Sequence, residues 1–514
     1  MTRRRLTQRG AERTSTDPRS HPNLHRLNTA GPPTRAIAAA VIICAAQAQA
    51  QAATSTSYLN GLTHFGQYSP YQPSATYGSG SPEWVGKILQ VNILQSNGAS
   101  EPTAKLSAAM QASVKKVAGR PKYSLKEMEF LSYAAGVLAS TRYGCKKDDD
   151  CEPFIRSSAS ARVKESSEQW LKGFMSEAGY GVSGSVTFPE TKGSNNTLFD
   201  NCPNLVDSLP SAQEEWRAVW TPPIIERLQR DEDFGLDSLV RCSSQLVFSD
   251  GTRDLLTIVC FAQDIVHFSY MCAFESLAIN ATFPFCGLFR RSELQYIEYD
   301  ADLDKYYEHS YGARLARSQA VGYLSEVLAR LESDRDYVNA DRIQVNHTVD
   351  SNPKTFPLRV KFMHADFTHD DQLLAVLTLL GFFQDSALST TLPCPMRTFV
   401  ASKTVPFAGR LVIEQVYTPI WEHMSWFRHE TVRILVNDKR MDLSKICTKV
   451  SNPQPHRQGL KRRVDRSLTR FLRVQDALTY GGTLCEYRRF AATLKKTIEI
   501  ATKEFEGCGF VPAI

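Results

Sequence analysis

Residues 362–384 contain a short strand, a polar turn and an apolar helix in succession, and this order constrains the fold more than any other stretch. The side chains of 362–367 alternate with the period of two that is typical of a strand. Apolar residues then recur at helical spacing, and Gly381 suits the end of a helix. His369 and Asp370 occupy the turn. In α/β sheets, ligands bind where a strand ends and a helix begins, and a helix N-terminus favours an anion.

The pair His369–Asp370 allows three interpretations. It can be a general acid with its orienting partner. It can also be a helix-capping Asp beside a surface His, and a lone dipeptide favours this simpler interpretation. A metal-dependent hydrolase would add His364 and Asp366, which share a strand face, but no distant residues complete a ligand set. The sequence therefore predicts neither a metal nor a cofactor.

The charge of the 514-residue chain is concentrated at its start. Residues 1–53 contain eight Arg, no Lys and only two acidic residues, so this leader alone accounts for the formal net charge of +6. The rest of the chain is formally neutral. Electrostatics therefore give no case for binding nucleic acid or a membrane surface.

The leader also has the pattern of a targeting segment. An apolar run at 36–46 is too short to span a bilayer. It follows Arg35 and precedes alternating Ala and Gln, which is typical of a secretory signal peptide with a long basic n-region. The Arg-rich, acid-poor segment 1–35 would also fit a mitochondrial presequence. We expect a secreted protein, with no membrane segment in its mature form.

Cysteine usage agrees with secretion. Of twelve Cys, Cys44 lies in the leader, and the other eleven form neither CxxC pairs nor zinc-like Cys–His spacings. Disulfides are therefore expected, and the odd number leaves at least one thiol unpaired. Three glycosylation sequons fit the same interpretation, at Asn195, Asn280 and Asn346.

Strand-like sequence occurs early and late in the chain, and a long helical stretch separates the two parts. This order predicts an α/β domain that carries a mainly helical cap. The expected division is a leader at 1–53, an α/β domain at 54–202 and 346–514, and a cap at 203–345. The predicted strands are 87–96, 153–158, 357–367, 403–416 and 430–437, and the predicted helices outside the cap are 104–142, 162–174 and 456–473.

Seven segments, in order along the chain, carry a resemblance to a known family. They are GQYSPY (66–71), PFIRSSASAR (153–162), DLDKYYEHSYG (302–312), VGYLSEVLARL (321–331), HADFTHDD (364–371), TVPFAGRLVIE (404–414) and VRILVND (432–438). Together they resemble the fungal phytases, which are the secreted phytase branch of the histidine acid phosphatases. The resemblance extends from about Gly66 to Cys508.

The resemblance implies a fold and an activity. The implied fold is a central mixed sheet flanked by helices, with an inserted, mainly helical cap. The implied activity is two-step hydrolysis of phosphomonoesters such as inositol phosphates. In this family a His in an Arg-His-Gly-x-Arg-x-Pro turn attacks phosphorus, and the Asp of a later His-Asp pair protonates the leaving oxygen. Arginines hold the phosphate dianion, a task that suits charged bidentate donors.

Matching positions give the candidate site. By the resemblance, Asp370 is the proton donor and His369 its partner on the phosphate. Arg156 is the phosphate clamp from the second strand, and Lys305 matches a basic residue of the substrate pocket. The expected partners are inositol phosphates or other phosphomonoesters, with neither nucleic acid nor a membrane involved. The resemblance implies no particular oligomeric state.

The first turn departs from the family. Asn97 stands where the nucleophilic His is expected, and Ser96 and Ser100 replace the two Arg. Asn cannot form a phosphoramidate intermediate, because its amide nitrogen is not basic. Glu101 adds a negative charge beside the dianion. Four neighbours match the family motif and fix the register, namely Gly98, Ala99, Pro102 and Thr103, and Thr103 stays a candidate phosphate-binding residue.

We therefore expect a phytase fold with a nucleophile turn that is inactive or strongly impaired. The alternative is a non-catalytic binder of phosphate or inositol phosphate that uses Arg156, Lys305 and His369. A third explanation is a mis-spliced gene product. It rests on extra sequence near 242–262, 417–429 and 448–480.

The resemblance also implies three disulfides, which pair Cys202 with Cys508, Cys272 with Cys286, and Cys447 with Cys485. Another family disulfide has lost both Cys, at about Gly86 and Thr418. Further candidate pairs are Cys145–Cys151 and Cys242–Cys260. Cys394 is then left unpaired.

Overall fold

The computed structural model describes the greater part of the chain beyond the leader. The described residues are 63–72, 87–100, 102–114, 130–143, 152–178, 185–191, 196–199, 202–206, 211–230, 253–279, 284–340, 343, 350–358, 362–422, 425–447 and 482–510. The predicted leader, the three sequons and the predicted helix at 456–473 lie outside them. The candidate pairs Cys145–Cys151 and Cys242–Cys260 also involve residues outside this part of the chain.

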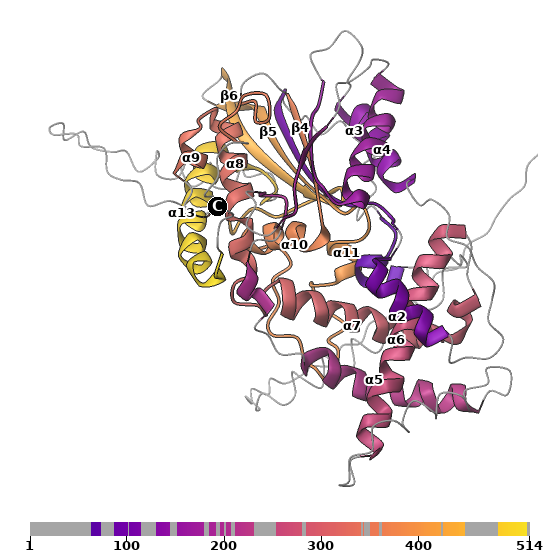
Figure 1. Cartoon of the computed structure of the whole chain (residues 1–514). Helices are drawn as coiled ribbons and strands as arrows, with labels where there is room; N and C mark the ends of the chain where they lie inside the picture. The colour runs from indigo at the N-terminus through magenta and orange to yellow at the C-terminus, as the bar shows by residue number, and fades with distance from the viewer. Residues whose placement is uncertain are drawn as a thin grey trace, which may run out of the picture. The chain divides into compact units, whose positions relative to one another are not determined.

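A mixed sheet organises the fold (Figure 1). Its strand order is β3-β2-β4-β1-β5-β6-β7, and β8 pairs with β6. The pairs β2–β3, β2–β4 and β1–β4 are parallel, whereas β1–β5 and β5–β6 are antiparallel. The predicted mixed sheet is therefore confirmed. The strands are β1 (Ile88–Ser96), β2 (Phe154–Ser158), β3 (Val186–Phe188), β4 (Met363–Thr368), β5 (Arg410–Glu422), β6 (Ser425–Val436), β7 (Lys439–Arg440) and β8 (Cys485–Glu486).

Helices surround the sheet, and none among the described residues is long and apolar enough to cross a membrane. The α-helices are α2 (Ala104–Val114), α3 (Phe130–Tyr143), α4 (Ala161–Ala178), α5 (Ser211–Gln229), α6 (Arg253–Ile279), α7 (Arg291–His309), α8 (Val321–Glu332), α9 (Asp336–Asn339), α10 (Asp370–Leu379), α11 (Ala401–Thr404) and α13 (Tyr487–Phe505). The short 3₁₀ helices are η2 (Gly66–Tyr68), η3 (Pro203–Val206), η5 (Pro284–Leu288), η6 (Ala316–Ala320) and η8 (Glu506–Cys508).

Two apolar layers bury the faces of the sheet. Val91 and Ile93 of β1 pack with α3 and α4, whereas Leu94 belongs to the larger core that includes α8, α10 and α13. Side chains of a strand point alternately to the two faces, so one strand serves both layers. Figure 1 shows α3 and α4 on one side of the strands and α8 and α13 on the other.

Between β3 and β4 the described residues are mainly helical, as predicted. There α5 packs on α6 and α7, and α2 from the N-terminal part also packs on α6. The last long helix of this stretch, α8, contacts the sheet through Glu326 and Arg330. The division into an α/β domain and a separate cap at 203–345 stays a prediction.

Strands β4 and β5 begin later than the sequence predicts, at Met363 and Arg410. Turns precede β4, and the short helix α11 occupies the start of the segment where β5 was expected. Pro406 follows that helix and has no backbone N–H to give to a strand ladder. Across the extra sequence at 417–429, β5 and β6 continue as an antiparallel hairpin.

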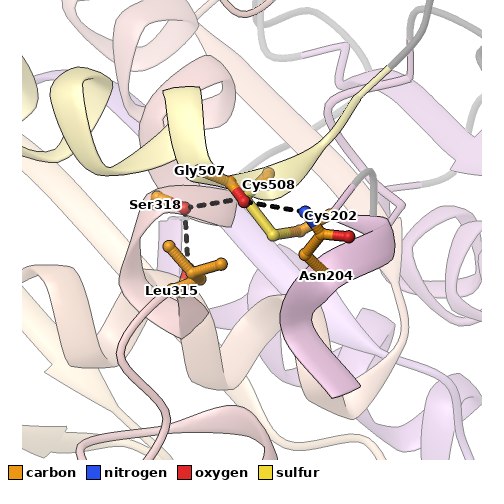
Figure 2. Close-up of a disulfide and its surroundings, with 6 residues drawn as sticks. All are labelled: Cys202, Asn204, Leu315, Ser318, Gly507 and Cys508. Atoms are coloured by element: carbon orange, nitrogen blue, oxygen red, sulfur yellow. Dashed lines mark hydrogen bonds between the residues drawn. A yellow bond between two sulfur atoms is a disulfide. The ribbon is translucent and has the colours of Figure 1, made fainter. Parts of the chain in front are cut away.

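Three disulfides confirm the pairings that the resemblance implied. They are Cys202–Cys508, Cys272–Cys286 and Cys447–Cys485. Figure 2 shows the first, which joins segments 306 positions apart in the sequence. Beside it, Asn204 Nδ2 donates to the oxygen of Gly507 at 3.0 Å. A cross-link of this length restricts the unfolded chain strongly. Cys394 is free and exposed, as predicted.

Candidate active site

The two turns expected to carry the chemistry meet at one edge of the sheet. β1 and β4 run parallel with Ser96 opposite Thr368, and the backbone N–H of Asn97 donates to the Thr368 oxygen at 3.0 Å. The turn after each strand therefore opens at the same carboxyl edge. A cavity of about 420 Å³ lies there. Six of the predicted site residues line it, namely Ser96, Asn97, Ser100, Thr103, Lys305 and Asp370.

Backbone contacts hold the β1 turn, by which we mean residues 96–103. The carbonyl of Asn97 accepts a hydrogen bond from the backbone of Ala408 at 2.8 Å. Its side-chain Nδ2 donates to the oxygen of the neighbouring Gly98 at 3.0 Å. Gly98 has no room for a side chain, since a Cβ there would lie 2.4 Å from Ser132 Oγ. The turn is thus closely packed, with the Asn97 side chain at the cavity.

The β4 turn, residues 368–372, brings Asp370 to the same cavity. His369 precedes α10 in an extended conformation, and no side chain caps the helix. Asp370 is the first helical residue, and its Oδ2 lies 2.7 Å from Lys305 Nζ. The interpretation of Asp370 as a helix cap is therefore wrong. Its carboxyl group lines the cavity, where a leaving oxygen would need a proton.

Lys305 is a buried cation held between two carboxylates. It is 4% exposed, and its Nζ lies 2.7 Å from Asp370 and 2.5 Å from Asp371. Burial opposes its charge, but the two carboxylates outweigh burial and raise the pKa of Lys305 well above its ordinary value. Burial would raise the pKa of Asp371, yet Lys305 and His309 bring it below its usual range. A phosphate that enters must compete with both carboxylates for this ammonium group.

His369 lies beside the cavity and contacts a guanidinium group. Its Nε2 is 2.8 Å from Glu190 Oε1, and its Nδ1 is 3.3 Å from Arg162 Nη2. A guanidinium can only donate, so Nδ1 accepts and Nε2 carries the proton that Glu190 accepts. Burial would raise the pKa of Glu190, but the hydrogen bond from His369 contributes to lowering it. In this arrangement His369 orients Arg162.

Arg156 is not among the residues that line the cavity, so the structure gives no support to the clamp role predicted for it. It is fully buried on β2, where its Nε lies 2.6 Å from Asp366 and its Nη2 lies 2.5 Å from Glu326. Arg330 Nη1 binds the other oxygen of Asp366 at 2.6 Å. Burial would raise the pKa of Asp366, but the two guanidinium groups hold it below its usual range. These four residues form a buried ionic cluster that joins β2, β4 and α8.

The guanidinium group that lines the cavity belongs to Arg162. Arg162 follows the Ser-rich turn after β2 and lies in the first turn of α4. Arg156 is in the middle of the strand, so its side chain points to one face of the sheet. A residue just past the carboxyl end of the strand can instead reach the ligand edge. The rule that located His369 and Asp370 would also have located Arg162.

The cavity lining also includes residues that the sequence did not single out as site residues, among them Tyr68, Lys105 and His267. Tyr68 comes from η2, and Lys105 lies at the start of α2, directly after the β1 turn. Burial raises the pKa of Tyr68 to about 12, although Lys305 lowers it in part, so its hydroxyl stays protonated. His267 comes from α6, and no spacing in the sequence connects that helix to the two turns.

The part of the chain that the structure describes contains no cluster of side chains that could bind a metal ion. No three His, Cys, Asp or Glu side chains gather there in a way that could hold an ion. His364 and Asp366, which a metal hydrolase would have used, are both fully buried in β4. Asp366 binds Arg156 and Arg330.

Sequence comparisons agree with this geometry. Residues 139–437, more than half of the chain, match the family described as the histidine phosphatase superfamily, branch 2. Phytase A of Aspergillus oryzae is 29% identical over 431 residues, which cover 75% of this chain and 84% of that protein. Phytase A of Arthroderma benhamiae is 28% identical over 413 residues, covering 73% and 83%.

Two solved structures share the fold. The phytase from D. castellii superposes with a TM-score of 0.56 at 16% identity, covering 88% of each chain. The multiple inositol polyphosphate phosphatase of Bifidobacterium longum has a TM-score of 0.50 at 14% identity, covering 76% of this chain and 95% of that one. Together with the family match, the two turns and the cavity between them place this chain in branch 2 of the histidine phosphatase superfamily.

Proposed function

We propose that this protein binds inositol phosphates or other phosphomonoesters in the cavity, and that its turnover by the histidine route is strongly impaired. The observation that carries the proposal is the position of Asn97. It lines the cavity at the end of β1, beside the β4 turn, at the place where the family's nucleophile is expected. The curated relatives are phytases, and one solved relative is an inositol polyphosphate phosphatase.

Attack on phosphorus requires an available electron pair on the nucleophile. An imidazole nitrogen has one, whereas the amide nitrogen of Asn97 shares its pair with a carbonyl group and donates hydrogen to Gly98. Removing a nucleophile from other enzymes lowers turnover by a factor on the order of 10⁴–10⁶. Asp370 can give a proton to a leaving oxygen. The new bond to phosphorus must form in the same step, however, and Asn97 offers no electron pair for it.

Anion binding is weakened but retained. Ser96 and Ser100 replace two guanidinium groups, and a charge-assisted hydrogen bond is worth about 1.5–3 kcal/mol. Lys105, Arg162 and Lys305 still line the cavity. These three cations come from α2, α4 and α7, so a ligand with several phosphate groups can contact more than one of them. This arrangement favours inositol phosphates over small monoesters.

Calorimetry with inositol hexasulfate tests the binding half of the proposal. This probe has the ring and the charged groups of an inositol phosphate but offers no phosphorus to attack. We expect heat of binding with the unaltered chain and weaker binding of inorganic sulfate. Absence of heat with both ligands would exclude the binding function.

Phosphate release from phytate and from an aryl phosphate at acid pH tests the catalytic half. We expect turnover of the unaltered chain close to the uncatalysed background. Asp370→Asn is the matched variant, because it removes the proton donor without altering the β1 turn. Turnover that is measurable in the unaltered chain and lost in Asp370→Asn would show that another group replaces the nucleophile.

We also propose that the protein is secreted. Its three disulfides support this, because disulfides persist in oxidising compartments and are rare in the cytosol. Expression of the whole chain in a eukaryotic secretory host tests it. We expect the protein in the medium with an N-terminus close to residue 53, whereas recovery from mitochondria would contradict secretion.

A further inference from the structure

Three polar residues, linked by hydrogen bonds, connect α2 and α6 at one wall of the cavity. Ser113 Oγ lies 2.6 Å from Asp264 Oδ1 and 2.7 Å from His267 Nδ1. Ser113 and Asp264 are each 2% exposed, whereas the ring of His267 lines the cavity. Gln263 Nε2 lies 3.0 Å from the other ring nitrogen of His267. Neither the nucleophilic step nor the protonation step described above uses these residues.

The hydrogen bonds determine which atoms of Ser113, Asp264 and His267 carry protons. The carboxylate of Asp264 can only accept, so Ser113 gives it its single proton and accepts from Nδ1 of His267. The neutral ring therefore carries its proton on Nδ1, and its Nε2 accepts from Gln263. A second proton can only go to Nε2. Gln263, which is exposed and one helical turn earlier, then loses its acceptor and moves away, so that an anion can take its place at the new N–H.

The ring of His267 can gain a charge when the solution is acidic. Histidine is the side chain whose ordinary charge change falls between about pH 5 and 8. The carboxylate of Asp264 is one hydroxyl group away from the ring, through Ser113. Two carboxylates are among the described residues that line the cavity, and both are already paired with Lys305. Among the residues that the structure describes, the charged ones that line the cavity besides His267 are Lys105, Arg162, Lys305, Asp370 and Asp371.

We propose that His267 is an anion-binding residue of this cavity that acts at acid pH. Its imidazolium form donates from Nε2 to a phosphate oxygen of the ligand, and Ser113 and Asp264 position the ring. This inference rests on the proposed function, because it requires that phosphate esters bind in the cavity. Protonation adds one cation to a site that lacks the two Arg of the family motif, so acidification strengthens binding.

Inositol hexasulfate is the probe for this inference, because sulfate esters stay fully ionised over the range used and only the protein titrates. For the unaltered chain we expect the Kd to fall on the order of tenfold between about pH 7.5 and pH 5, the effect of one charge-assisted hydrogen bond. His267→Gln should abolish this tightening, so that its Kd at about pH 5 stays close to its Kd at about pH 7.5. A purely structural role of His267 would instead change the Kd equally at both pH values.

Two further variants complete the experiment. His64→Gln is the matched control, because His64 lies outside the cavity and contacts Glu298 at 3.2 Å, and it should tighten like the unaltered chain. Ser113→Ala keeps the ring but removes the connection to Asp264, and the tightening should shift to lower pH. Equal tightening in His267→Gln, or an unshifted pH profile of the Kd in Ser113→Ala, would overturn this inference and leave the proposed function intact. Absence of binding by the unaltered chain at every pH would contradict the proposed function as well.

Discussion

The β1 turn and the β4 turn follow adjacent parallel strands and line the same cavity, yet their side chains behave differently. In the β1 turn the side chains bond to backbone oxygens, as Asn97 Nδ2 does to Gly98 and Ser96 Oγ does to Gly409 at 3.2 Å. In the β4 turn they bond to ionisable side chains of other parts of the fold. Asp370 pairs with Lys305 of α7.

This difference shows which side chains of the two turns contribute to folding and which would serve catalysis alone. The β1 turn is held through its own backbone groups, as in the hydrogen bond that the Gly98 N–H donates to Ser166 Oγ of α4 at 2.9 Å. Its side chains can change without loss of the fold. The side chains of the β4 turn join α10 to α7 and His369 to Glu190, so they also contribute to folding. A chain can therefore lose its nucleophile and keep an intact acid half.

Restoring the β1 turn is the most severe test of this comparison. We expect Asn97→His, combined with Ser96→Arg and Ser100→Arg, to raise phytate turnover by a factor on the order of 10⁴ or more, because a nucleophile and two phosphate ligands return to an intact fold. Phosphate release at acid pH measures the gain.

The control adds Asp370→Asn to the restored chain. Loss of the proton donor should lower the recovered turnover by roughly 10²–10⁴-fold. If the triple variant bound inositol hexasulfate but released no phosphate, the β4 turn would not be a working acid half, and the contrast between the two turns would fail.

The two Arg of the segment 153–162 provide a second, smaller test. Arg156→Met should lower the free energy of unfolding by about 3–5 kcal/mol, because it removes one of the two guanidinium groups that balance the buried carboxylates of Asp366 and Glu326. Arg162→Met should change stability little and weaken inositol hexasulfate binding on the order of tenfold. Denaturant unfolding and calorimetry measure the two effects. Equal loss of stability in both variants would contradict the assignment of separate roles.

The strands could be predicted because each depends on a local pattern, whereas the mixed sheet and the three disulfides were implied by the family resemblance. The β-branched and Leu-rich run at 87–96 and the alternation in 362–367 each indicate a strand, and the turn after β4 follows from the polar residues between strand and helix. The resemblance then fixed the positions of Asn97 and Asp370 within those turns. Both line the cavity.

The roles of individual charged residues could not be predicted in the same way. Arg156 and Arg162 look alike in sequence, but one faces Asp366 across the β2–β4 register and the other lies past the strand end. The carboxylate partners of Arg156 come from β4 and α8, far away along the chain. His267 reaches the cavity only because α6 packs on α2. Long-range packing of this kind leaves no periodic signal.

The smallest predicted effect concerns the charge balance of the β4 turn. Asp371→Asn should tighten inositol hexasulfate binding roughly fivefold, since it removes about 1 kcal/mol of repulsion and frees Lys305 from one carboxylate. Glu308→Gln is the matched control, because it makes the same charge change outside the cavity and should leave the Kd unaltered. Calorimetry at about pH 7 compares the two variants with the unaltered chain.

The melting temperature of Asp371→Asn should depend on pH in a direction that can be checked. The pKa of Asp371 is below its usual range, because Lys305 and His309 outweigh burial. A lowered pKa means that the carboxylate stabilises the fold above about pH 3.9 and that this contribution is lost as pH falls further. The melting temperature of Asp371→Asn should therefore lie below that of the unaltered chain near neutrality, and the gap should close only in strong acid. A gap that closed already at about pH 6 would mean that Asp371 is not held ionised by Lys305.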